Sequence, residues 1–436
     1  QAEDGIRDVA VTGVQTCALR SDGRTLTKFV EQSLGNLHRP LSNEQLTAAD
    51  LQRTGIAGFV ASATGMLAST GVVLAGLSAV GASASQSISA VFAMLISYGA
   101  LAIALSWRYR MPLTIVWSTP GAALLVSTTS LALPFEQAVG GFLVSGLLIV
   151  LTGLWPTLGR LVSRIPAPLA SAMLAGVIFN FCVAPFLELP AYPAVMIPVL
   201  VLWVTLKRVA PLWAVPVAIV AGSAIVLTTV EGVNIAWGLP MLELTTPSFT
   251  PSAVFSVAIP LYVVTMASQN IPGIAVMKSY GYTVPFKAAM VSTGIASTLG
   301  SLAGGFNQNL AAITAALNAN DHAHPDMRKR WLASTAGGIT YLLFALGATV
   351  FVSLVSSTPR ELLLALAGLA LLDTLASALT TAMSDSALKL PALATLAMTA
   401  SGITLGGVGA AFWALLFGLA LALVLRPRHA PREADS

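Results

Sequence analysis

The sequence predicts an all-α polytopic membrane protein with about 14 transmembrane segments, arranged as a 7+7 inverted repeat. Three observations lead to this fold class. Of the 436 residues, 56% are hydrophobic and 9% are charged, with a mean hydropathy of +0.82, whereas soluble domains carry about 25% charged residues. Apolar stretches long enough to cross a bilayer as helices recur along the chain. Basic residues gather in every second loop, which is the positive-inside pattern.

Composition and motifs exclude several other classes. A spanning β-barrel needs alternating polarity, but stretches such as Ala411–Leu425 are apolar on all sides. Cys17 and Cys182 are the only cysteines, so no disulfide framework is indicated. The sequence contains no metal-site, haem or phosphate-loop motif, so we expect no metal, no cofactor and no ATP-driven step. The net charge of +4 reflects membrane topology, and we expect no nucleic-acid partner.

The N-terminal segment has two predicted parts. Residues 1–21 have neither an apolar core nor a helical period, which excludes a signal peptide. They read like the translation of a sequencing-library adapter, and we interpret them as a non-native, adapter-derived tail. The alternative is a disordered native tail. Residues 22–54 are predicted to form a cytoplasmic N-terminal segment.

Fourteen apolar runs between Pro, Gly and charged residues are candidate spans. The first seven should form one repeat over residues 55–230, followed by an extracellular or periplasmic linker at 231–252. The other seven should form a second repeat over 253–425, and 426–436 a cytoplasmic tail. The runs cover residues 55–80, 88–107, 113–130, 137–156, 168–187, 192–206, 211–229, 253–277, 286–303, 306–319, 331–355, 361–383, 390–404 and 406–425.

Loop charges support this count and give an orientation. With a cytoplasmic N-terminus, the loops on the inner side hold basic pairs and clusters such as Arg108 with Arg110 and Arg328–Arg330. The outer loops hold glutamates, and Arg360 is their only basic residue. A miscounted helix would scramble this separation further along the chain. We therefore predict a multi-pass protein of the cell (inner) membrane, in the lipid bilayer, with both termini cytoplasmic.

Weak internal similarity indicates a duplication. Three pairs of short segments match at offsets of 189, 192 and 199 residues, close to half the chain. Because seven spans is an odd number, the second copy should be inverted relative to the first, as in many transporters. The pairs are Thr119–Leu125 with Gln308–Thr314, Leu174–Gly176 with Leu366–Gly368, and Ala68–Gly71 with Ala267–Asn270.

The third and tenth spans are predicted to be broken helices. Thr114–Trp117 is β-prone and is followed by a break at Ser118–Gly121, while Gly304–Asn309 precedes a short helical run. Each should form an extended half and a half-helix. Half-helix N-termini meeting near the midplane would present N–H groups and positive dipole ends to an anion. The substrate-binding candidates here are Ser118, Thr119, Gly121, Phe306, Asn307 and Asn309, and Trp117, Phe306 or Phe59 could supply an apolar wall.

The alternative for both spans is an ordinary Pro/Gly kink, with the Asn side chains binding the freed backbone groups. The eighth span poses a similar choice. Ser268, Gln269 and Asn270 are polar side chains in an apolar segment, and such residues tend to face an interior cavity. They either bind substrate or hold neighbouring helices together.

Asp373 is the proton-coupling candidate. It lies among leucines in the middle of the twelfth span, where desolvation would raise its pKa. The alternative is a carboxylate that caps a helix or pairs with a polar group. Asp385 is expected at the membrane edge, and Lys278 is expected to anchor the membrane interface.

Two of these segments resemble the benzoate/proton symporter family (BenE). The matching motifs are Gln269–Tyr282 and Asn309–Ala316, the second followed by His322–Pro325, and the similarity extends from about Leu41 to Leu425. The family belongs to a larger group of fourteen-span nucleobase and anion transporters. The resemblance implies a core domain of spans one to four and eight to eleven. The remaining spans would form a gate domain, and substrate would cross by an elevator-type movement.

The resemblance also implies the function, import of benzoate or a similar aromatic carboxylate with protons. Related nucleobase transporters have acidic residues in spans eight and ten, where this chain has Gln269, Asn270 and Asn307–Asn309. Losing fixed negative charges suits an anionic substrate. A nucleobase or other small-anion proton symporter and a passive anion channel stay open as alternatives, as does a homo-oligomer. No catalytic constellation lies in the spans, so an enzyme is not expected.

Overall fold

The computed structural model describes residues 46–155, 157–158, 160, 165–229, 236–356, 360–406 and 408–425. From Ala49 onward these residues belong to one compact unit. The predicted tails at 1–21 and 426–436 lie outside the described residues, as do 22–45 and 231–235. The segment from 236 to 250 has no helix or strand, and its assignment as a linker stays a prediction.

The described residues of the first half of the chain form seven α-helices and one strand. Ser83 begins α3 with a reciprocal capping box to Gln86, and Ser118 caps α4, where Pro120 occupies the first turn. The helix α2 begins seven residues before the predicted span. The elements are α2 (Ala48–Ala79), α3 (Ala84–Tyr109), β1 (Ile115–Trp117), α4 (Thr119–Ser127), η1 (Thr129–Leu131), α5 (Phe135–Leu154), α7 (Ala167–Leu187), α8 (Pro193–Val209) and α9 (Pro211–Thr229).

The second half begins with a helix that contains two π-helical segments. These are η2 (Val254–Ala258) and η3 (Met266–Asn270), which separate α10 (Pro251–Ala253), α11 (Ile259–Thr265) and α12 (Ile271–Ser279). Each π-helical segment ends two residues before a proline, Pro260 or Pro272. Because proline has no N–H and its ring clashes with the carbonyl four residues earlier, the regular α-helical bonding changes there.

The rest of the second half follows the predicted runs. The run predicted at 331–355 is broken at Gly347 and bends by 69°. The elements are α13 (Phe286–Ser301), β2 (Gln308–Leu310), α14 (Ile313–Ala319), η4 (Met327–Lys329), α15 (Trp331–Leu346), α16 (Ala348–Ser356), α17 (Arg360–Ala382), α18 (Lys389–Ala400) and α19 (Ala410–Val424).

The helical membrane architecture predicted from composition is confirmed in its coarse form. Among the described residues, six helices are long and apolar enough to cross a membrane, or seven if the bent α15–α16 pair is one span. Each predicted run coincides with at least one helix. The count of 14 spans and their division into two inverted repeats stay predictions.

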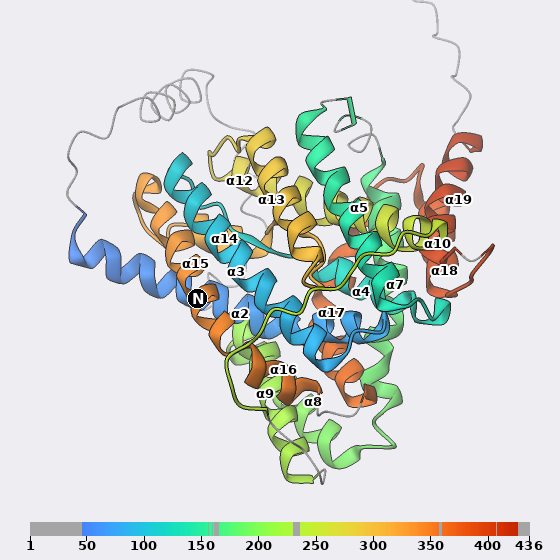
Figure 1. Cartoon of the computed structure of the whole chain (residues 1–436), viewed down its shortest axis with the longest axis horizontal. Coiled ribbons are helices and arrows are strands. Elements are labelled where there is room, and N and C mark those ends of the chain that lie inside the picture. The colour runs from blue at the N-terminus through green and yellow to red at the C-terminus, as the bar shows by residue number, and fades with distance from the viewer. Residues whose placement is uncertain are drawn as a thin grey trace, which may run out of the picture. The chain divides into compact units, whose positions relative to one another are not determined.

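Helices far apart in sequence pack against one another (Figure 1). The most extensive contacts join α7 to α17, α5 to α13 and α3 to α15, while α8 with α9 and α18 with α19 form hairpins. Glycine allows the closest approach between α7 and α17. A Cβ on Gly368 would lie 2.0 Å from the carbonyl oxygen of Phe181, so only a residue without a side chain fits there.

A charged cluster connects the start of α2 to the segment after α14. The Asp50 carboxylate lies 2.9 Å from His324 Nε2 and 2.8 Å from Lys329 Nζ. The buried Arg330 donates to the carbonyl oxygens of Ala319 and His324. Partial burial acts to raise the pKa of Asp326, but hydrogen bonds and attraction from Arg328 outweigh it and hold this pKa below its usual value.

The fit of Gly368 against α7 predicts that Gly368→Ala destabilises the protein. The added methyl group must displace the Phe181 backbone, and such overpacking typically costs about 1–3 kcal/mol. We expect a lower thermal unfolding midpoint in detergent micelles. The control is Gly55→Ala, because a Cβ on Gly55 meets no atom within 4 Å. An unchanged midpoint for Gly368→Ala would contradict the close approach.

Candidate functional site

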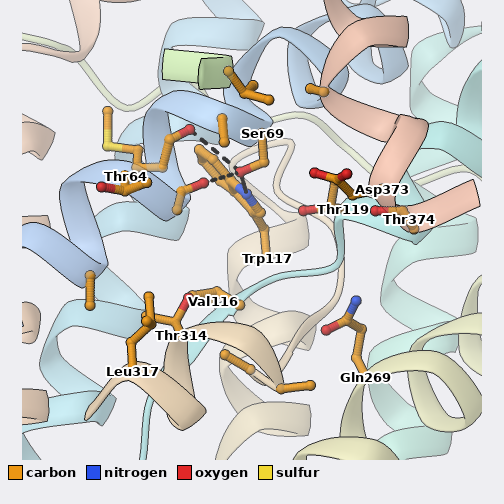
Figure 2. A pocket seen from close by; sticks show the side chains of 18 of the residues that line it. Thr64, Ser69, Val116, Trp117, Thr119, Gln269, Thr314, Leu317, Asp373 and Thr374 are labelled. Carbon is orange, nitrogen blue, oxygen red and sulfur yellow. Dashed lines mark hydrogen bonds between the residues drawn. The ribbon is translucent and has the colours of Figure 1, made fainter. Parts of the chain in front are cut away.

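A cavity of about 260 Å³ lies where the two halves of the chain meet. Its lining comes from α2, α3, β1, α4 and α9 of the first half and from η3, the start of α14, α15 and α17 of the second half. We call it the central cavity (Figure 2). Its polar and aromatic lining residues are Thr64, Ser69, Tyr98, Trp117, Thr119, Gln269, Thr314, Tyr341, Asp373 and Thr374.

Two paired strands bring the half-helices to this cavity. The strands β1 and β2 are antiparallel, with Val116 opposite Asn309, and two further backbone bonds extend the ladder. The N–H of Ser118 donates to the Asn307 carbonyl, and the N–H of Ala311 donates to the Thr114 carbonyl, both at 2.9 Å. Because the strands run in opposite directions, α4 and α14 begin at opposite ends of the ladder. The broken form predicted for both spans is therefore confirmed.

The first turns of both half-helices line the cavity. Thr119 and Pro120 come from α4, Thr314 comes from α14, and Ala311 and Ala312 lie immediately before α14. At α14 no side chain caps the N-terminus, so its first-turn N–H groups are not bound by a capping side chain. Helix N-termini carry partial positive charge. This part of the cavity lining therefore favours a negatively charged group.

An aromatic wall faces the same space. The ring nitrogen of Trp117 donates to Ser69 Oγ at 2.8 Å. The ring of Tyr98 contacts Trp117 edge-to-face at 5.8 Å between centroids, and it contacts Tyr341 at 4.7 Å. Figure 2 shows the Trp117 ring nitrogen directed at Ser69, and the Gln269 amide below Thr119 and to the right of Val116 in that view. The hydrogen bond and ring contacts hold this wall in one orientation.

Three of the predicted site residues line the central cavity, namely Thr119, Gln269 and Asp373. Ser118 and Gly121 lie just behind Thr119. Ser118 Oγ accepts hydrogen bonds from the Gly121 N–H and from Thr265, each at 3.1 Å. A Cβ on Gly121 would lie 2.5 Å from a methyl group of Leu261. Both residues therefore fix the position of α4.

The candidates on the tenth span are fully buried beside the cavity. The Asn307 amide donates to Ser145 at 2.7 Å and to Thr265 at 3.3 Å, and the Asn309 amide donates to the Leu310 carbonyl at 3.0 Å. Phe306 packs against Phe142, with 6.0 Å between ring centroids. These three residues stabilise the broken helix in this structure and are not part of the cavity lining.

On the eighth span, one candidate lines the cavity and the other two form hydrogen bonds within the protein. Gln269 reaches the cavity, whereas Ser268 donates to the Val264 carbonyl on its own helix at 2.5 Å. Asn270 is fully buried, and its side-chain oxygen accepts from the Leu310 N–H at 2.9 Å. Asn270 thus connects the π-helical segment η3 to β2. Contact with a neighbouring element is the alternative to substrate binding that the sequence leaves open for this residue.

Asp373 has different surroundings from those predicted. The expectation that leucines desolvate it is wrong, because its side chain is 70% exposed and its carboxylate forms an ion pair with Lys207 of α8. The helix α17 turns this position toward the cavity, where Asp373 and Thr374 both contribute to the lining. This exposure does not decide whether Asp373 carries a proton, and that role stays a prediction.

Several cavity residues were not identified from sequence. Ser69 had a signal, because Ala68–Gly71 matches Ala267–Asn270 in the second half. Tyr98 and Tyr341 had none, and neither had Lys207, which binds the lining residue Asp373, since isolated tyrosines and lysines at helix ends are common in membrane proteins. Among the described residues, no group of three or more His, Cys, Asp or Glu side chains is arranged to bind a metal ion.

Comparison with known proteins settles the family. The model of the benzoate membrane transport protein family, BenE, matches residues 50–424. The chain belongs to the BenE family. The family consists of membrane transporters rather than enzymes, and the chain is a multi-pass membrane protein. The match spans every element that lines the central cavity.

Two curated relatives and two solved structures extend this BenE assignment. Inner membrane protein YdcO of Escherichia coli is 37% identical over 84% of this chain and 94% of its own. The benzoate membrane transport protein of Acinetobacter baylyi is 32% identical over 78% of this chain and 87% of its own. The transmembrane domain of the cyanobacterial bicarbonate transporter BicA aligns with a TM-score of 0.52 at 16% identity, covering 87% of this chain and 98% of that one. The structure of SLC26A9 aligns with a TM-score of 0.56 at 13% identity, covering 85% of this chain and 65% of that one. These two structures share the fold.

The contact between Asn270 and β2 predicts that Asn270→Ala destabilises the protein. The substitution leaves the buried Leu310 N–H without a partner, which typically costs about 1–3 kcal/mol. We expect a clear fall in the thermal unfolding midpoint. Ser268→Ala is the matched control, because it removes only a bond within the same helix, and its midpoint should stay near that of the wild type. Equal midpoints for the two variants would contradict the bridging role of Asn270.

Proposed function

We propose that this protein is a secondary active transporter that imports benzoate or a similar aromatic carboxylate together with a proton. The observation that carries the proposal is the central cavity, where two half-helices begin beside an aromatic wall. The curated relative from Acinetobacter baylyi is named a benzoate membrane transport protein, and the family description agrees with it. Both names concern a small molecule with one ring and one negative charge.

The cavity chemistry fits such a molecule. The carboxylate would bind at the first turns of α4 and α14, with Thr119 and Gln269 as hydrogen-bond donors, and the ring would lie against Trp117 and Tyr98. A volume of about 260 Å³ lies below the ~300–1,000 Å³ of common ligand pockets, which suits a small substrate. Ser118, Gly121, Asn270 and Asn307 would act indirectly, by positioning these groups.

We further propose that the chain has 14 spans, arranged as two seven-span repeats that are inverted relative to each other. If the halves are equivalent, α3 corresponds to α13 and α5 corresponds to α15. The contact of α3 with α15 then matches the contact of α13 with α5, and the α8–α9 hairpin matches the α18–α19 hairpin. The antiparallel pairing of β1 with β2 is what a two-fold axis in the membrane plane would produce.

An elevator-type movement is supported by the grouping of these contacts. The helices α7–α9 and α17–α19 contact one another extensively, as do α3, α5, α13 and α15. The first group would be the gate domain, and the second group, with the half-helices, would be the core. Thr119 and Gln269 then lie on the core, and Asp373 lies on the gate. Movement of one group past the other would carry substrate across the membrane.

The proposed orientation places the protein in the inner membrane with both termini cytoplasmic. The cavity lining includes Pro211, the first residue of α9, in a connection that follows the basic pair Lys207–Arg208. By the positive-inside rule this connection is cytoplasmic. The structure would therefore correspond to a state open toward the cytoplasm.

A nucleobase is a second candidate, because the Gln269 amide offers both a donor and an acceptor, and the aromatic wall would suit any planar ring. Another small anion and a passive anion channel on the same scaffold are further alternatives.

Initial rates of labelled benzoate uptake into proteoliposomes, with and without an inward proton gradient, separate these possibilities when competition by uracil is measured in parallel. Protein-free liposomes correct for permeation by benzoic acid. Uptake of labelled benzoate no faster than in protein-free liposomes, together with saturable uptake of labelled uracil, would overturn the proposal in favour of a nucleobase. Uptake that never exceeds equilibrium would indicate a channel.

Removal of a donor from the cavity should weaken transport. Gln269→Ala deletes the amide that reaches the cavity, and a lost hydrogen bond to a charged group is worth about 1.5–3 kcal/mol. We expect at least a tenfold rise in the benzoate concentration for half-maximal uptake, with an unchanged unfolding midpoint. Gln52→Ala is the control, since Gln52 lies exposed at the start of α2. Wild-type kinetics for Gln269→Ala would exclude this residue from the binding site.

A further inference from the structure

An ion pair lies at one edge of the central cavity, with Asp373 in the cavity lining and Lys207 bound to it. Lys207 lies in the last turn of α8, and its ammonium group binds the carboxylate of Asp373, halfway along α17. Lys207 is 25% exposed, and Asp373 is 70% exposed and lines the cavity. In the proposed arrangement both residues belong to the gate, facing the half-helices across the substrate space.

Asp373 poses an electrostatic problem for an anion carrier. It is the only charged side chain among the residues that line the cavity, so an unpaired carboxylate there would repel a substrate carboxylate. Lys207 neutralises this charge, but a lysine engaged by Asp373 is not free to bind an anion. A substrate anion can therefore bind Lys207 only when Asp373 is neutral.

We propose that substrate and Asp373 exchange places as the counter-ion of Lys207, and that this exchange couples anion transport to the proton. A proton from the aqueous side neutralises the Asp373 carboxylate and releases Lys207. The substrate carboxylate then binds the ammonium group together with the first turns of the half-helices. This inference rests on the proposed transport of a carboxylate and adds the residue that selects for negative charge.

The charges balance in this exchange. Before it, the site holds Lys207 at +1 and Asp373 at −1. After it, the site holds Lys207 at +1, the substrate at −1 and a neutral Asp373. One anion and one proton have entered, and the net charge is unchanged. The net charge of the cavity is therefore the same with and without substrate, whereas a substrate that entered without a proton would leave an uncompensated negative charge there.

Among the charged groups near Asp373, Lys207 is the one that pairs with it. Among the described helices, α7, α9 and α18 pack against α17, and α8 reaches it through Lys207. The helices α7 and α9 contain no charged residue, α18 contains Lys389 at its first position, and α8 contains Arg208 next to Lys207. On α17 itself, Arg360 and Glu361 lie at the start, twelve or more residues away. The remaining titratable side chains of the cavity lining are Tyr98 and Tyr341, and no other charged side chain of the lining competes for the proton.

A second contact keeps Lys207 at the cavity when the pair opens. Its ammonium nitrogen lies 5.6 Å from the centre of the Trp203 ring, one turn earlier on α8. Such cation–π contacts hold a lysine in place without neutralising it. Lys207 can thus give up Asp373 and still point toward the incoming carboxylate.

The test compares two readouts in proteoliposomes that contain the full chain. One is exchange of labelled for unlabelled benzoate without a gradient, and the other is accumulation driven by an inward gradient of one pH unit, which can supply up to about tenfold for one proton per substrate. Asp373→Asn, which resembles the protonated residue, should keep exchange within about threefold of wild type and lose driven accumulation. Lys207→Met should lose exchange by about tenfold or more, and Lys207→Arg should retain it.

Matched controls and opposite outcomes complete the test. Asp385→Asn and Lys389→Met alter a second Asp and Lys near the end of α17, outside the cavity lining, and should change neither readout. Size-exclusion profiles verify folding, and Asp373→Asn alone decides the matter if Lys207→Met misfolds. Driven accumulation by Asp373→Asn, or wild-type exchange by Lys207→Met, would overturn the inference. Absence of benzoate transport by the wild type would instead overturn the proposed function, and this inference with it.

Discussion

Backbone hydrogen bonding inside a bilayer is the constraint on which this structure depends. A helix that stops within the hydrocarbon region exposes N–H and C=O groups that lipid cannot bind. Here two interrupted helices satisfy each other, because β1 pairs with β2 and the ladder continues through Ser118 and Ala311. Asn270 binds one more backbone group of this segment. The paired strands thus permit two helix N-termini inside the protein, and the central cavity forms around them.

Much of the fold was predictable because its signals are local. Runs of apolar residues set the helix positions, and Pro120 and Gly304–Gly305 marked where two helices break. The bend at Gly347 was missed, since a single glycine in an apolar run has no distinctive pattern. The fourteen-span count and the repeat were inferred from loop charges and three short matches, and both await direct determination of topology.

The site was only partly predictable, because polarity in a span does not reveal direction. Gln269 and Asn270 are neighbours with similar side chains, yet one reaches the cavity and the other binds β2. Asp373 was singled out as an isolated charge, but its partner Lys207 lies 166 residues away, and no local pattern connects them. Tyr98 and Tyr341 likewise meet only after folding. Long-range contacts of this kind are set by packing geometry.

The charged cluster around Asp50 has a mechanical consequence. Asp50 joins α2 to His324 and Lys329, and Arg330 holds the carbonyl at the end of α14, so two helices that line the cavity are fastened together at one end. These helices form a stiff side of the cavity, while the side built from α9 and α17 is joined to α8 by the Lys207–Asp373 pair, which opens in the proposed exchange. Changes in cavity shape should therefore concentrate on that compliant side, and the stiff side should set which ring shapes fit.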